Sequence, residues 1–218
     1  MKILIIAPHP DDEVLGCGGT MAKYSARGDE VYLCIVTKAY TPDWSEEFIE
    51  NRPKEVKEAG SILGVKQVYF LDFPTVKLDT VPQKELNGAL AGVINEIAPD
   101  VVYIPSKGDL HKDHRLVFES ALVAARPAEG RAMKILSYET LSETEYGGAV
   151  NQFIPNFYED ISQTFQKKLD AMKVYKSELK LYPNPRSLEI MEVLAKKRGS
   201  EASLELAEAF MLIREISI

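Results

Sequence analysis

The chain of 218 residues is long enough for a single domain with a substantial hydrophobic core. Its hydrophobic content of 45% and charged content of 27% are ordinary for a globular protein. The net charge of −7 argues against a nucleic acid or an anionic membrane as the main partner, because both need clustered Lys and Arg.

Strand-like and helix-like segments alternate along the first 140 residues. Short runs rich in Ile, Val, Leu and Tyr predict buried strands, and the longer segments between them predict helices. In chain order they are strand 2–7, helix 14–27, strand 31–37, helix 45–63, strand 67–71, helix 82–97, strand 101–104, helix 111–126 and strand 133–138. Pro53 falls inside the second helix and predicts a kink or two shorter helices.

This alternation predicts an α/β fold, with a doubly wound, mostly parallel sheet and helices on both faces. We expect one domain over 1–218, with an α/β core over 1–140 and a loop and helical part over 141–218. Residues 140–156 have few periodic signals and predict a long loop. From about residue 161 to the end we expect mostly helix, interrupted by P-N-P-R at 183–186.

The cysteines and the N-terminus predict a cytoplasmic protein. Cys17 and Cys34 form no C-x-x-C pair and fall in different predicted elements, so we expect no disulfide and a reducing compartment. The apolar run from Ile3 to Ala7 is shorter than the core of a signal peptide. No stretch approaches the roughly 20 apolar residues of a membrane span, so we expect no integral membrane segment.

All three histidines follow the ends of two predicted strands: His9 follows strand 2–7, and His111 and His114 follow strand 101–104. In a doubly wound sheet these two strands are neighbours at the point where the strand order reverses, and ligands bind there. The sequence therefore predicts one shared site.

The residues of this site are those of a metal centre. Three consecutive acids at 11–13 repel one another unless a cation lies among them. His9, Asp12 and one histidine of the second loop would give three ligands and an open position, as in a catalytic zinc site. Asp11 would then be available to accept a proton from water, and Asp113 could fix a histidine's tautomer.

Simpler interpretations exist for each residue alone. Asp11, Asp12 and Asp113 could cap the helices that follow them, and a single histidine at a strand end is usually a surface or capping residue. These explanations do not account for the gathering of every histidine at the two loops.

Two motifs resemble those of the PIG-L/LmbE-like N-acetylglucosaminyl deacetylases. A-P-H-P-D-D-E-V-L-G-C-G-G-T at 7–20 resembles the family's A-H-P-D-D-E-x-x-G-x-G-G, with Pro8 as an insertion, and D-L-H-K-D-H-R at 109–115 resembles D-x-H-x-D-H-R. The resemblance implies a Rossmann-like fold and a zinc-dependent enzyme. Such an enzyme removes the N-acetyl group from a small N-acetylglucosamine conjugate, giving a free amine and acetate.

The resemblance also implies roles for individual residues. Carried over by motif position, the Zn²⁺ ligands are His9, Asp12 and His114. Asp11 is then the general base. His111 stabilises the tetrahedral intermediate or protonates the leaving amine, and Asp113 orients it. Arg52 resembles a family arginine that reaches the active site and contacts substrate.

Several alternatives stay open. Two histidines and one carboxylate also suit Fe²⁺, so a non-haem Fe(II) enzyme would use the same site. A metal-dependent amidase would act on another sugar or thiol conjugate. A phosphoesterase would need a second ion, for which Glu13 and Asp109 are candidates, and a catalytically inactive binding protein is a further alternative.

Substrate specificity is expected to lie in the 140–156 loop and the C-terminal part. Tyr146, Arg186 and Arg198 are candidates for residues near the pocket. The region 161–218 could instead form the interface of a homo-oligomer.

Overall fold

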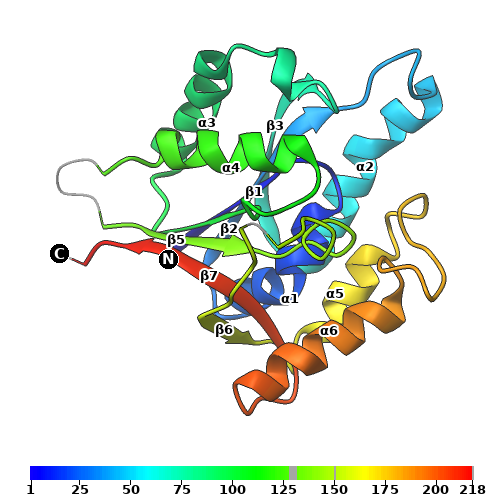
Figure 1. The fold of residues 1–218 in the computed structure, drawn as a ribbon, viewed down its shortest axis with the longest axis vertical. Helices are drawn as coiled ribbons and strands as arrows, with labels where there is room; N and C mark the ends of the chain where they lie inside the picture. The colour runs from blue at the N-terminus through cyan, green and yellow to red at the C-terminus, as the bar shows by residue number, and fades with distance from the viewer. Residues whose placement is uncertain (128–131, 150, 218) are drawn as a thin grey trace.

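The computed structural model describes residues 1–127, 132–149 and 151–217. In this part of the chain seven strands form one sheet in the order β3-β2-β1-β4-β5-β7-β6 (Figure 1). The strands are β1 (Lys2–Ala7), β2 (Glu30–Lys38), β3 (Val65–Pro74), β4 (Val101–Ile104), β5 (Lys134–Tyr138), β6 (Phe157–Asp160) and β7 (Ala207–Glu215). The helices are α1 (Asp12–Ala26), α2 (Glu46–Leu63), α3 (Gln83–Ile97), α4 (Lys112–Ala124), α5 (Phe165–Met172) and α6 (Leu188–Glu201), with a short 3₁₀ helix η1 (Leu78–Thr80).

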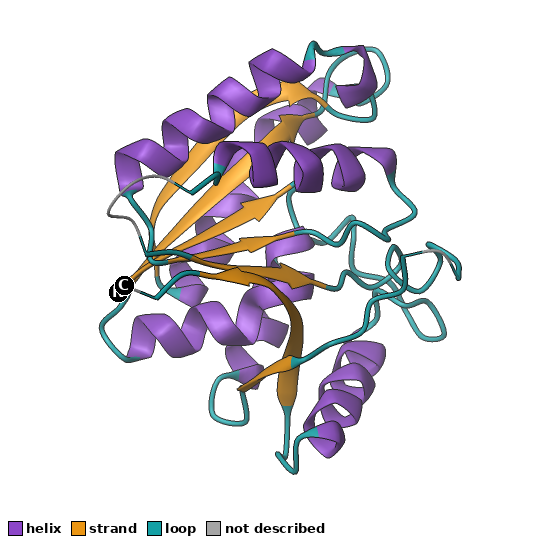
Figure 2. Cartoon of the chain, turned by 60° about the vertical axis from the view of Figure 1, so that its left-hand side comes forward, coloured by secondary structure: helices purple, strands orange, loops and turns teal. Residues whose placement is uncertain are grey.

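The first five strands are parallel, and their order places β1 beside β4. β1 pairs with β2 on one side and with β4 on the other, so the direction of winding reverses between β1 and β4. Helices lie on both sides of the sheet (Figure 2). The predicted doubly wound, mostly parallel α/β fold is therefore confirmed. Among the described residues, no helix has both the length and the apolar character needed to cross a membrane.

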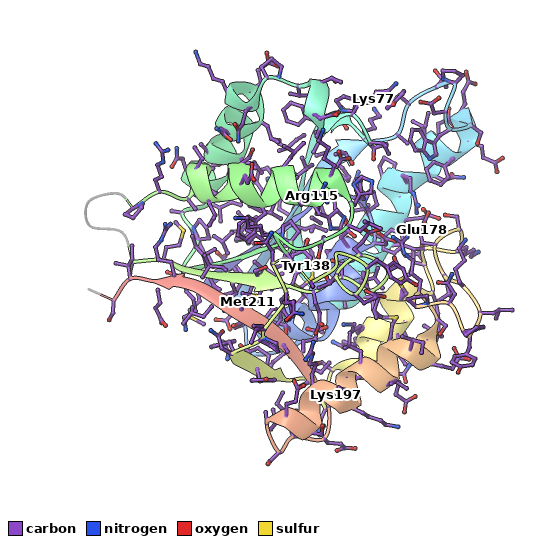
Figure 3. All side chains as sticks on the ribbon, viewed as in Figure 1. Lys77, Arg115, Tyr138, Glu178, Lys197 and Met211 are labelled. Carbon is purple, nitrogen blue, oxygen red and sulfur yellow. The ribbon has the colours of Figure 1, made fainter. Side chains whose placement is uncertain are left out.

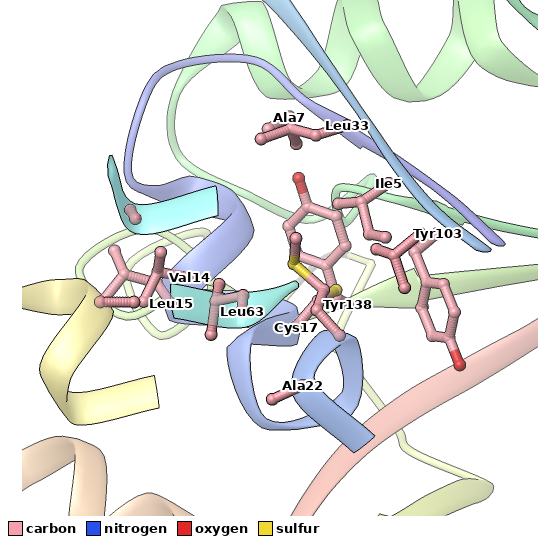
Figure 4. Packing of buried hydrophobic residues seen from close by; sticks show 14 of the residues in the cluster. Ile5, Ala7, Val14, Leu15, Cys17, Ala22, Leu33, Leu63, Tyr103 and Tyr138 are labelled. Carbon is pink, nitrogen blue, oxygen red and sulfur yellow. The ribbon is translucent and has the colours of Figure 1, made fainter. Parts of the chain in front are cut away.

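Each face of the sheet has its own hydrophobic core. One core joins the sheet to α1, α2 and α5, and the other joins it to α3 and α4. Tyr138 and Cys17 belong to the first core (Figure 4). A Cβ at Gly16 would lie 2.3 Å from a ring carbon of Tyr138, so glycine is what lets α1 approach β5. This close approach fixes the start of α1, which carries the predicted site residues.

Helix α2 runs unbroken through Pro53, so the expected division into two helices is wrong. Both ends of α2 are strongly defined. Ser45 accepts a hydrogen bond from the Phe48 backbone N–H, and Gly64 closes the helix in a left-handed conformation. Buried Val56, Ala59 and Leu63 hold the second half of α2 in the core, and this packing outweighs the effect of one proline.

The C-terminal region is not mostly helical, because Ala207–Glu215 forms strand β7. β7 pairs antiparallel with both β5 and β6 and so lengthens the sheet. Its sequence, AEAFMLIRE, is rich in residues that favour helices. Pairing on both edges overrides that preference, because β-propensity depends strongly on context.

A buried ion pair between α5 and β7 is hydrogen-bonded to the backbone of α1. The Lys168 ammonium lies 2.6 Å from Glu208 Oε1 and donates to the Leu15 carbonyl. The Glu208 carboxylate also accepts hydrogen bonds from the backbone N–H groups of Gly19 and Thr20. Both charged side chains are almost fully buried, so each charge is stabilised by the other instead of by water.

We predict that Glu208→Ala lowers the free energy of unfolding by about 3–5 kcal/mol, because it leaves the Lys168 charge buried without a partner. Urea unfolding followed by circular dichroism measures the change. Glu192→Ala is the matched control, since the Glu192–Lys196 pair lies on the exposed surface of α6 and should change stability by less than about 1 kcal/mol. Equal losses in the two variants would contradict the prediction.

Candidate metal and catalytic site

The predicted site residues meet where β1 and β4 end. His9 follows β1, and Asp12 is the first residue of α1. His111 precedes α4 as its N-cap, and His114 lies in the first turn of that helix. The strand order therefore brings together two loops that lie about a hundred residues apart in the chain, as the sequence predicted.

Three side-chain atoms converge at this point. His9 Nδ1 lies 3.3 Å from Asp12 Oδ2, and His114 Nε2 lies 3.2 Å from the same oxygen. The two histidine nitrogens are 3.3 Å apart. The three atoms thus form a nearly equilateral triangle.

This triangle has the size that a tetrahedral metal site requires. Ligands bound to Zn²⁺ at about 2.0–2.1 Å lie about 3.3–3.4 Å apart in tetrahedral geometry. The second carboxylate oxygen of Asp12, Oδ1, is buried and has no hydrogen-bond partner among the described residues. Two imidazoles and one carboxylate, whose second oxygen is buried and unpartnered, therefore fit a divalent ion.

The electrostatics of the triangle favour a positive charge. Burial alone would raise the pKa of Asp12, but His114 and His9 hold it well below its usual range. Burial alone would lower the pKa of His114, but Asp12 and Asp109 raise it to about 10. The carboxylates thus stabilise a cation at this place, which a proton or a metal ion can supply.

A second layer of carboxylates orients both histidines. Asp109 Oδ2 lies 2.8 Å from His114 Nδ1, and Asp113 Oδ2 lies 3.0 Å from His9 Nε2. Each carboxylate contacts the ring nitrogen that points away from the triangle, as second-layer partners of metal ligands do. Asp113 also accepts the backbone N–H groups of Val76 and Leu78, and Asp109 accepts the Thr144 hydroxyl at 2.6 Å.

The partner of Asp113 differs from the expectation. Its carboxylate is 4.0 Å from His111 Nδ1, too far for a hydrogen bond, and contacts His9 instead. It is the backbone N–H of Asp113 that donates to His111 Nδ1, at 3.1 Å. His111 is therefore oriented by the start of α4 rather than by an acidic side chain.

His111 carries a ring N–H group that is available to donate a hydrogen bond. It packs edge-on against His9 with ring centroids 4.6 Å apart, so its ring lies within the same histidine cluster. Burial and the neighbouring histidines lower its pKa to about 4, so the ring is neutral at pH 7. Because Nδ1 accepts the Asp113 N–H, the proton of the neutral ring must lie on Nε2.

Asp11 lies beside the triangle and faces the cavity. Its φ of 108° is unusual for a residue other than glycine. Its backbone N–H donates to Glu13 Oε2, and Glu13 Oε1 accepts the Tyr175 hydroxyl at 2.5 Å. Burial raises the pKa of Asp11 well above its usual range, and Arg186, with one nitrogen 3.0 Å from Asp11 Oδ2, opposes that shift.

Glu13 and Asp109 do not form a second ion site. Burial raises the pKa of Glu13 to about 7, and its two oxygens are used by the Asp11 backbone and by Tyr175. Asp109 is used by His114 and Thr144. This arrangement gives no support to the two-ion phosphoesterase hypothesis.

A cavity of about 200 Å³ opens beside the triangle. His9, Asp11 and His111 line one side of it, and Arg52 and Arg186 line another. Both arginines bind the same carboxylate, that of Glu178. Glu178 lies in the loop after α5 (Figure 3). Arg52, which the sequence predicts to contact substrate, therefore lines the cavity, and its charge is paired there with Glu178.

Two of the three specificity candidates lie elsewhere. Arg186 lines the cavity, and its Nε donates to the Ser142 hydroxyl at 2.7 Å. Arg198 pairs with Glu139 and Glu201, away from the described lining of the cavity. Tyr146 is 54% exposed and also lies outside that lining.

Residues 4–125 match the model of a protein family described as PIG-L, GlcNAc-PI de-N-acetylase. This match spans more than half of the chain and contains both histidine motifs. The chain belongs to this family.

Relatives of known name support this assignment. The chain is 34% identical over 184 residues to an uncharacterized deacetylase, YaiS, of Escherichia coli K12, which covers 80% of this chain and 90% of that protein. It is 31% identical over 189 residues to the diacetylchitobiose deacetylase of Thermococcus kodakarensis, with 81% and 70% covered. Its fold matches the N,N'-diacetylchitobiose deacetylase of Pyrococcus horikoshii, complexed with an inhibitor, with a TM-score of 0.75 at 26% identity, covering 97% and 83% of the two chains.

The contacts of Glu178 do not follow from the sequence, because nothing near this residue in the chain signals that it will meet Arg52 and Arg186. The pairing of Asp109 with His114 has a signal in the sequence, because both acidic residues of the D-L-H-K-D-H motif are candidates to orient its histidines.

We predict that Asp109→Asn weakens Zn²⁺ binding by about 10–100-fold, because it removes the carboxylate that orients His114. His114→Ala should remove tight binding altogether. Competition with a chromophoric chelator measures both affinities. Asp79→Asn is the control, since Asp79 is a half-exposed partner of Lys112 outside the cluster. An Asp109→Asn affinity equal to that of the control would contradict the proposed ligand arrangement.

Proposed function

We propose that this protein is a metal-dependent N-deacetylase that hydrolyses the acetamide of an N-acetylglucosamine conjugate, giving a free amine and acetate. The observation that carries the proposal is the triangle of His9, Asp12 and His114, with Asp11 beside it at the cavity. The family membership and the names of the relatives support the same reaction.

Zn²⁺ is the metal we propose, held by His9, Asp12 and His114. Three protein ligands of this kind with an open position are typical of catalytic zinc. Two histidines and one carboxylate also suit Fe²⁺, so the metal loaded in the cell is a matter for measurement. When bound, the ion supplies Lewis acidity, which polarises an amide carbonyl and makes a water molecule more acidic.

Asp11 is the proposed general base. Its carboxylate faces the cavity and is not part of the triangle, so it is available to take a proton from the attacking water. Burial raises its pKa, which strengthens its hold on that proton. Arg186 fixes the position of the carboxylate through the contact at Oδ2.

His111 is the proposed donor to the oxyanion. The Nε2–H inferred for its neutral ring can donate a hydrogen bond to negative charge that develops on the acetamide oxygen. The proton for the departing amine is the one that Asp11 takes from water, because loss of the Nε2 proton would leave the neutral His111 ring as an anion. Asp113 contributes by holding His111 through its backbone and His9 through its carboxylate.

Arg52 is proposed to position the substrate. Its guanidinium is held between Glu55 and Glu178 and lies over the Phe48 ring at 4.4 Å. A side chain fixed on three sides presents its remaining polar edge to the cavity at little cost in side-chain entropy.

We infer a cytoplasmic location from the cysteines. Cys17 and Cys34 are both buried and free, which suits a reducing compartment. Assembly into a homo-oligomer stays a prediction.

Acetate release from a panel of N-acetylated sugars tests the function directly. The panel holds N-acetylglucosamine, N,N′-diacetylchitobiose, a nucleotide sugar, an inositol glycoside and a malate glycoside. We expect release from at least one compound, abolished by a chelator and restored by Zn²⁺. Acetate release that persists in the presence of the chelator would show that the reaction does not depend on a metal ion. A requirement for oxygen would favour the Fe(II) alternative, and no release would favour an amidase acting on another conjugate.

Asp11→Asn should retain metal and lower kcat by about 10²–10⁴-fold, because it removes the base while leaving the triangle in place. Steady-state acetate release and metal content, measured on the same preparation, give both quantities. Glu205→Gln, an exposed acid far along the chain, is the control. Near-native turnover in Asp11→Asn would overturn the assignment of the base.

A further inference from the structure

A groove of about 530 Å³ lies between α6 and the loop that follows β5. Its apolar lining comes from both elements: Leu141, Phe153, Ile190, Val193 and Leu194. Val193 is 59% exposed, and Ile190 and Leu194 are half-buried, so this side of α6 is apolar and open to solvent. We call this feature the α6 groove. An exposed apolar surface of this kind commonly marks a contact with another molecule.

A second exposed apolar feature lies in the connection between α5 and α6, at the surface of the molecule (Figure 1). Leu181 is 87% exposed and Tyr182 is 64% exposed, and we call these two residues the apolar tip. The Asn184 backbone N–H donates to the Leu181 carbonyl at 3.0 Å, and the Lys180 N–H donates to the Arg186 carbonyl at 3.3 Å. These bonds close the segment into a turn before any partner binds, which lowers the entropy cost of docking.

The surroundings of the tip and of the groove carry opposite charges. Lys176 and Lys180 precede the tip, and both are exposed and make no ion pair with the described residues. The two bases of the groove, Lys197 and Arg198, already pair with acids of their own chain. Glu145 also lines the groove, and this exposed acid has no ion-pair partner in the described part of the chain. The basic flank of the tip therefore suits the acidic rim of the groove.

We propose that the apolar tip of one copy of this chain docks in the α6 groove of a second copy. Neither tip residue lines the groove of its own chain, so both surfaces are available to a partner. A stable interface buries about 800 Å² on each partner, which is more than two side chains supply. A two-fold dimer meets this requirement, because each copy then contributes both its tip and its groove, and the contact is made twice.

This contact bears on two loops beside the catalytic cavity. The segment that carries the tip also carries Glu178 and Arg186, which line the cavity. Thr144, in the lining of the α6 groove, donates its hydroxyl to Asp109, the carboxylate that orients His114. Docking therefore supports both loops from outside the cavity. The assembly itself does not depend on which reaction the cavity catalyses.

Light scattering after size-exclusion chromatography, over a series of protein concentrations, tests the assembly. We expect the native protein to have twice the mass of the single chain. Leu181→Asp in the tip and Val193→Asp in the groove should each raise the dissociation constant at least about tenfold, because each places a charge in an apolar contact. Both positions are exposed in the single chain, so circular dichroism should stay native. Val76→Asp, at a 57% exposed position between β3 and η1, is the matched control and should keep the native mass.

Cross-linking shows which surfaces meet. Cys17 and Cys34 are buried, so Tyr182→Cys and Val193→Cys each supply one accessible thiol to their chain. When the two variants are mixed and treated with a short bismaleimide, we expect a covalent dimer that contains one chain of each. A mixture of Tyr182→Cys with Val76→Cys is the control, and its chains should stay unlinked.

A single-chain mass at every concentration overturns the proposal, because no second copy then occupies the groove. Assembly that survives both aspartate substitutions also overturns it, since the interface then lies elsewhere. Cross-links that join Tyr182→Cys chains only to one another indicate contact between two tips and reject the groove as the docking surface. Loss of assembly in both variants, together with the mixed cross-link, supports the proposal.

Discussion

Three consecutive buried carboxylates after β1 are the constraint on which the rest of this structure depends. Asp11, Asp12 and Glu13 are each no more than 2% exposed. Like charges in so small a volume are unfavourable unless each is compensated. Each of the three acids is compensated by different side chains.

Asp12 is compensated by His9 and His114, which ties β1 to the loop after β4. Asp11 is compensated by Arg186, which brings the loop after α5 to the mouth of the cavity. Glu13 accepts the Tyr175 hydroxyl and, because burial raises its pKa to about 7, is partly protonated near neutral pH. The compensating groups outside the first loop come from the start of α4 and from the segment between α5 and α6, so the acids join both segments to the end of β1.

The sequence predicts the fold correctly where the signal is a local pattern of residues or the order of the strands. Five parallel strands, the helices between them and the meeting of His9 with His114 follow from hydrophobic runs, helix-terminating glycines and strand order. The sequence is misleading for β7, because a run such as AEAF has no intrinsic preference for a strand and takes its conformation from its neighbours β5 and β6. It does not pair Asp113 with His9, because that contact depends on side-chain directions across two loops. The contacts of Glu178 with Arg52 and Arg186 are unpredictable for the same reason.

Two neighbouring residues connect the histidine cluster to the long loop that follows β5. Asp109 holds His114 with one oxygen and the Thr144 hydroxyl with the other, and Thr144 in turn accepts the Thr140 backbone N–H. The carbonyl of Glu143 accepts the Leu110 N–H, and its carboxylate accepts the His111 N–H. Replacement of either loop residue would therefore disturb the position of a histidine. Over evolution, changes in this loop that leave the reaction intact are confined to its other positions.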